Sequence, residues 1–143
     1  MIPFTDREIR NAWRNNKIAS NVELGRKTNA HRLLLFYSIE CGLKALLLKR
    51  MSLTRSDHCT ELMEVGHNIN KLLDTLHAGN ELKIPSSLSL SKIKDNRGQY
   101  TQRHFSNKDI NQIWRYGGSC INISDDQLED ILGRIDGWIG EQL

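Results

Sequence analysis

Two short segments of the chain place an arginine a few residues before a histidine. Arg97 precedes His104 with six residues between them, and Arg26 precedes His31 with four between them. A histidine titrates near neutral pH, so it can take the proton of an RNA 2′-hydroxyl or protonate the leaving 5′-oxygen. An arginine can hold the phosphate and stabilise the charge that develops in the transition state. Either pair could therefore cleave RNA without a metal ion and leave a 2′,3′-cyclic phosphate.

The two pairs differ in how well a helix would bring their side chains together. Residues seven apart on a helix return to nearly the same face, about 10 Å along the axis, whereas residues five apart diverge by about 140°. The spacing favours Arg97 and His104 as the catalytic pair, with Arg26 and His31 as the second choice. Arg103, beside His104, adds a cation that could bind RNA phosphate. The alternative interpretation of both pairs is that they are ordinary solvated basic residues.

The sequence predicts neither a cofactor nor a metal site, because no cluster of His, Asp and Glu has ligand spacing. Cys41, Cys59 and Cys120 are odd in number, widely spaced and without a CxxC motif. This pattern is typical of reduced structural cysteines in a cytoplasmic protein. The first ten residues contain acids and no apolar signal core. No run of about 18 apolar residues is present, so neither secretion nor a membrane span is expected.

The length of 143 residues fits one domain, residues 1–143. The charge is distributed unevenly along it. Residues 1–55 carry 11 Lys and Arg against 4 Asp and Glu, whereas residues 121–143 carry 1 against 6. A basic N-terminal half could attract nucleic acid. The alternative is that basic and acidic surfaces face one another, within one chain or across a dimer.

The elements that must position these residues are predicted to be helices. Capping patterns mark three starts: Thr5 with Glu8, Asn68 alone, and Ser124 with Gln127. The longest helix is predicted from about residue 29 to 51, since its apolar residues recur three and four apart. The residues expected in the core are Phe36, Ile39, Leu43, Leu46 and Leu47 of this helix, Ile69, Leu72, Leu73 and Leu76 of the next, and Leu128, Ile131, Leu132, Ile135, Trp138 and Ile139 of the last.

Residues 79–106 lack sustained periodicity and are rich in Ser, Gly and Lys. A segment of this kind is predicted to be a long loop, which in a compact domain is either functional or mobile. A short helix beginning near Ser106 and Asp109 follows it, and Gly117 and Gly118 end that helix. The sequence therefore predicts an all-α fold, an up-and-down bundle of four to five helices with a long loop before the last two.

The order of these segments resembles the HEPN superfamily of small helical-bundle proteins. The segment HRLLLFYSIECGLKALLLKR, 31–50, is similar to that family's helix with a Glu and a Lys among apolar residues. GHNINKLLDTL, 66–76, resembles its following helix, and IWRYGG, 113–118, resembles its late aromatic segment. The resemblance covers about residues 5 to 140 and implies a HEPN-like bundle.

The resemblance also implies function. Many members of the superfamily resemble metal-independent endoribonucleases whose signature is an Arg and a His separated by four to six residues, which both pairs above match. They typically build this site at a homodimer interface. The chain is then expected to be a ribonuclease of a toxin–antitoxin or phage-defence system, with RNA and an antitoxin as partners. The alternative is a noncatalytic HEPN module that dimerises and binds a partner protein or nucleic acid.

Two charges, Glu40 and Lys44, interrupt the most apolar helix. They are four apart with the Glu first, which is the favourable order for an ion pair on a helix surface. A carboxylate at the edge of the core needs a donor, and Arg115 and Tyr116 are the candidates. We therefore predict that Glu40, Arg115 and Tyr116 form a structural anchor between the longest helix and residues 113–118. His67 is expected to cap or pack at the start of its helix.

Overall fold

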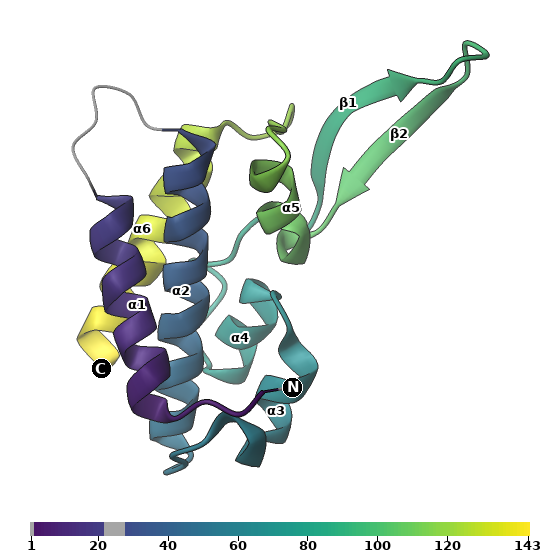
Figure 1. Ribbon diagram of the computed structural model, residues 1–143. Helices are drawn as coiled ribbons and strands as arrows, with labels where there is room; N and C mark the ends of the chain where they lie inside the picture. The colour runs from purple at the N-terminus through teal and green to yellow at the C-terminus, as the bar shows by residue number, and fades with distance from the viewer. Residues whose placement is uncertain (1, 22–27) are drawn as a thin grey trace.

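A bundle of helices around one long central helix forms the body of the protein, whose computed structural model describes residues 2–21 and 28–143 (Figure 1). The two long N-terminal helices, α1 (Asp6–Ser20) and α2 (Asn29–Arg50), run antiparallel and pack together. α2 also contacts α6 (Asp125–Gln142), α5 (Ile110–Arg115) and α4 (Ile69–Thr75), so it occupies the centre of the bundle. Among the described residues, the remaining α-helix is α3 (Thr60–Val65), and two short 3-10 helices are η1 (Ser56–His58) and η2 (Asn107–Asp109).

The helix starts and the core are largely where the sequence predicts them. Thr5 and Glu8 form the capping box of α1, Asn68 caps α4, and Ser124 and Gln127 form the capping box of α6. The expected apolar residues of α2, α4 and α6 are buried, apart from the partly exposed Trp138. No helix in the parts of the chain that the structure describes is long and apolar enough to cross a bilayer.

The all-α prediction is wrong, because part of the expected loop is a β-hairpin. β1 (Leu88–Lys94) pairs antiparallel with β2 (Tyr100–Phe105), and the hairpin projects from the body beside α5 (Figure 1). The fold is therefore mixed, with a two-stranded sheet and six α-helices among the described residues instead of four or five helices alone.

Local sequence explains the hairpin. Leu88 and Leu90 alternate with serines, which is the period of a strand with one buried face. The turn is closed by the Asp95 carboxylate, which accepts the backbone N–H groups of Arg97 at 2.8 Å and Gln99 at 2.9 Å. Gly98 adopts φ +82°, a conformation that costs glycine little. The remaining five residues of β1 are not buried, so the sequence has no sustained apolar alternation that would predict the strand.

Candidate functional site

The outer part of the hairpin, residues 91–104, is a basic arm exposed to solvent. Lys92, Lys94 and Arg97 are exposed on it. Residues 88–105 contain four Lys and Arg against a single acid, Asp95. The Asp95 carboxylate is already engaged by the backbone of the turn. The arm therefore presents a locally positive surface, well separated from the acidic helix α6 (Figure 1).

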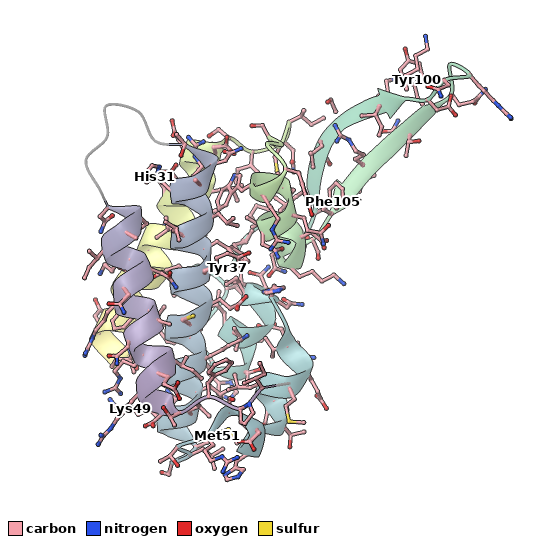
Figure 2. All side chains as sticks on the ribbon, in the orientation of Figure 1. His31, Tyr37, Lys49, Met51, Tyr100 and Phe105 are labelled. Carbon is pink, nitrogen blue, oxygen red and sulfur yellow. The ribbon has the colours of Figure 1, made fainter. Side chains whose placement is uncertain are left out.

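An aromatic ring lies at the centre of this positive surface. The Tyr100 side chain is 59% exposed near the tip of the arm (Figure 2). The Nζ atom of Lys92 lies 4.8 Å from the centre of the ring, and that of Lys94 lies 5.7 Å from it. These are cation–π distances. A ring flanked by two ammonium groups can stack on a nucleobase while the cations meet the neighbouring phosphates.

The arm does not bring Arg97 and His104 together within one chain. His104 lies opposite Ser89 near the base of the hairpin, and its Nδ1 atom is 3.1 Å from Ser89 Oγ. Arg97 lies in the turn, beyond Tyr100. The strand rises about 3.3 Å per residue, so Tyr100 and His104 alone are separated by about 13 Å. A spacing of seven residues brings two side chains to one face of a helix, whereas the extended strand observed here separates Arg97 from His104.

Arg103 lies on the other face of the hairpin. It is opposite Leu90, and its Nε atom donates to the carbonyl of Ser91 at 2.8 Å. With Phe105 it lines a pocket of about 170 Å³ between the base of the hairpin and α5. Arg103 therefore borders this pocket, on the face of the hairpin opposite to His104.

The second-choice pair is described only in part. Arg26 lies outside the described residues. His31 is in the first turn of α2, where its Nδ1 atom is 2.8 Å from Thr28 Oγ1.

A histidine–carboxylate dyad lies where α2 meets the start of α4. Glu40 is only 8% exposed, and its Oε1 atom is 2.5 Å from Nδ1 of His67. Its Oε2 atom is 3.3 Å from Nζ of Lys44, the ion pair that the spacing predicts. A carboxylate that is ionised only accepts, so this contact would then use the Nδ1–H group of His67 as its donor and leave the Nε2 atom outside it. The His67 side chain is 48% exposed, so Nε2 belongs to an accessible ring.

A hydrogen bond links α2 to Arg115, but it is made by Tyr37 and not by Glu40, the partner that the sequence predicts. Arg115 donates to the hydroxyl of Tyr37 at 2.7 Å, and Tyr37 lies one helical turn before Glu40. Two hydrogen bonds raise the pKa of the Arg115 guanidinium, which therefore stays charged. The bond to Tyr37 has the larger effect and the bond to Tyr116 the smaller. The Glu40 carboxylate is satisfied by His67 instead, because α4 places that ring one turn further along the same side of α2.

The dyad and the anchor are adjacent. The rings of Tyr37 and His67 are 6.4 Å apart between their centres, and Figure 2 shows Tyr37 between α2 and the elements that carry the hairpin. The imidazole of His67 and the guanidinium of Arg115 thus both lie next to Tyr37. The sequence predicts His67 at the start of its helix, where it directly precedes the Asn68 cap, but it does not predict the contact with Glu40. A carboxylate in a core helix requires a donor, but the sequence does not show which donor reaches it.

The cysteines do not contribute a reactive group. All three are free thiols, and burial raises the pKa of Cys41 to about 11 and also raises the pKa of Cys59 and of Cys120. In residues 2–21 and 28–143, no three His, Cys, Asp or Glu side chains gather as a set of metal ligands.

Comparison of the chain with models of protein families, with curated proteins and with solved structures found no match. Membership of the HEPN superfamily therefore remains a prediction from the sequence. The candidate site has to be judged on its own geometry.

Proposed function

We propose that this chain is an RNA-binding protein and that the basic arm is its principal contact with RNA. The observation that carries the proposal is the exposed ring of Tyr100 with Lys92 and Lys94 lying over it. A stacked base and two neutralised phosphates are the common elements of single-strand binding. The resemblance to HEPN proteins favours RNA as the polyanion.

The proposed ligand is unpaired RNA. A base can stack on Tyr100 only when it is free of its own helix, and sequence-tolerant binding of unpaired bases uses aromatic rings in this way. The arm stands away from the body, so a flexible strand can pass along it without meeting the acidic face of α6 (Figure 1).

The test is RNA binding by a matched pair of double variants, measured by fluorescence anisotropy with a short labelled oligonucleotide. Lys92→Ala with Lys94→Ala removes two charges from the arm. Arg7→Ala with Arg14→Ala removes two exposed charges from α1, on the opposite side of α2. The arm variant is expected to bind about tenfold or more weakly than wild type, and the α1 variant to bind nearly as wild type. Equal losses in both variants would refute the proposal, because binding would then follow overall charge.

A second candidate function, metal-independent cleavage of RNA, is favoured by the Glu40–His67 dyad. In this proposal the buried carboxylate holds the ring through Nδ1. The Nε2 atom of His67 then takes the proton of a 2′-hydroxyl, whose oxygen attacks the adjacent phosphorus and forms the cyclic phosphate. The 5′-oxygen leaves and takes up a proton from solvent or from protonated His67. The guanidinium of Arg115 stabilises the phosphate charge.

The position of the dyad relative to the arm supports the combination. The chain passes from β2 through a short 3-10 segment, Asn107–Asp109, into α5, and α5 ends at Arg115, which donates to the hydroxyl of Tyr37. In this proposal an RNA strand held on the arm runs over α5 to the dyad.

Cleavage is tested with His67→Ala, His104→Ala and His31→Ala on one RNA substrate in the presence of EDTA. His67→Ala is expected to abolish cyclic-phosphate products while keeping RNA affinity, and the other two variants are expected to cleave as wild type. Loss of cleavage only in His104→Ala or only in His31→Ala would assign the chemistry to the corresponding Arg–His pair. Absence of cleavage by the wild type would leave RNA binding as the function.

A further inference from the structure

A small pocket lies between the base of the hairpin and α5. Its volume is about 170 Å³. Pockets for whole drug-sized ligands begin near 300 Å³, so a complete nucleotide would not fit inside it. A single nucleobase with its sugar and phosphate outside is the ligand of matching size.

The floor of the pocket is apolar and closely packed. Leu90 from β1 and Ile113 from α5 are both buried at this point. Gly118 closes the floor, since its N–H donates to the carbonyl of Ile113 at 2.7 Å. A Cβ atom at residue 118 would lie only 3.0 Å from Leu90 Cδ2 and 3.1 Å from the carbonyl oxygen of Ile113. The floor is therefore an apolar surface to which β1, α5 and Gly118 contribute.

Aromatic and polar groups stand around this floor. Phe105 lies at the base of the hairpin (Figure 2), and the Tyr116 ring, 78% exposed, borders the pocket from the end of α5. The Tyr116 side chain is hydrogen-bonded to the guanidinium of Arg115. Gln112 and Arg103 supply the polar rim. The Gln112 side chain is exposed and makes no hydrogen bond within the part of the chain that the structure describes.

We propose that this pocket binds one unpaired nucleobase of the RNA, adenine in preference to uracil. The ring stacks against Tyr116 and Phe105, as unpaired RNA bases stack on aromatic side chains. The free amide of Gln112 offers one donor and one acceptor side by side, the pattern that pairs with N7 and N6 of adenine. Arg103 at the rim meets a phosphate that flanks the base.

The inference rests on the proposed RNA binding and adds base selection to it. The arm supplies contacts that any sequence can make, whereas the pocket reads one base. The two contributions are separable, because phosphate contacts change the salt dependence of binding and a stacked base does not.

The experiment compares oligo(A) and oligo(U) binding by wild type, Tyr116→Ala, Tyr116→Phe and Gln112→Met. Wild type is expected to bind oligo(A) more tightly. Tyr116→Ala should weaken oligo(A) binding about 5- to 150-fold with an unchanged salt dependence, and Tyr116→Phe should keep the wild-type affinity because the ring remains. Gln112→Met keeps the length of the side chain without its amide and should equalise the two ligands.

The outcomes distinguish the inference from the proposal beneath it. If Tyr116→Ala and Gln112→Met bind both ligands as wild type does, the pocket is no base site while RNA binding by the arm stands. If wild type binds neither oligonucleotide, both fail together. Melting curves of the four proteins check that each variant is folded.

Discussion

A single methyl group added at Gly42 tests how the three long helices meet. Gly42 lies inside α2, and a Cβ atom there would be 2.7 Å from Trp13 Cδ1 of α1 and 2.9 Å from Ile139 Cδ1 of α6. Trp13 cannot move freely, since its Nε1–H donates to Asp136 at 2.9 Å. Overpacking of a core typically costs about 1–3 kcal/mol. Replacing glycine by alanine inside a helix stabilises the helix by up to about 1 kcal/mol, which offsets part of this packing cost.

The matched control is the same substitution in α6. At Gly137 no atom lies within 4 Å of an added Cβ atom. Gly137→Ala should therefore stabilise the helix without any steric clash. Gly42→Ala is therefore expected to be about 1–3 kcal/mol less stable than Gly137→Ala in urea unfolding at equal m-values. For a chain of this size the difference corresponds to roughly 3–10 °C in melting temperature.

A second substitution locates the clash. Ile139→Val removes the Cδ1 atom that lies 2.9 Å from the added methyl group. By itself it should cost about 0.5–1.5 kcal/mol, but combined with Gly42→Ala it should cost less than the sum of the two. If Gly42→Ala and Gly137→Ala stabilise the protein equally, the three-helix junction described here is incorrect.

Three further predictions concern the dyad, the thiols and the assembly. Glu40→Ala should destabilise the fold by about 1.5–3 kcal/mol in urea unfolding, less than for a fully buried pair because His67 and Lys44 can rehydrate, and an unchanged midpoint would show the dyad to be dispensable. Cys41, with its pKa raised to about 11, should react slowly with iodoacetamide at pH 8 until the protein unfolds. Because an unfolded thiol ionises near pH 8.5, its contribution to stability is constant below that pH and is lost as the pH rises through 11; rapid labelling of the folded protein would contradict this. The homodimer expected from the family resemblance should scatter light as twice the 16.5 kDa chain, and a monomer at tens of micromolar would exclude it.

The sequence predicts the helical body well because its signals are local or periodic. The capping boxes of α1 and α6 need only residues three apart, and the core of α2 and α4 repeats at the helical period. These features do not depend on the rest of the fold. The central position of α2 follows from its being the longest and most apolar of the helices.

The hairpin is harder to predict because most of its residues are exposed and do not pack on the body of the protein. Only Leu88 and Leu90 of β1 are buried, so the strand has no sustained apolar face, and its serines and lysines resemble those of a loop. The turn signal around Asp95 and Gly98 was available, as was the enrichment of β2 in Tyr, Thr and Phe. The spacing of Arg97 and His104 would bring them to one face of a helix, whereas the extended strand separates them.

Of the two residues of the dyad, the sequence singles out Glu40 but does not identify His67 as its partner. A carboxylate in the core of α2 demands a donor, and the sequence correctly directs attention to Glu40. Which donor arrives depends on how α4 and α5 pack on α2, and that is a tertiary choice. His67 takes the carboxylate, and Arg115 goes to Tyr37 one turn earlier. No local pattern separates these two pairings.

The central claim is that the arm binds RNA through its phosphates, and the salt dependence of binding tests it most directly. Each phosphate contact on a single strand contributes about −0.7 to the slope of log K against log salt concentration. The two contacts from Lys92 and Lys94 then predict that the slope of Lys92→Ala with Lys94→Ala is less steep than that of wild type by about 1.4. The same slope in both proteins, or no binding by wild type, would contradict the account.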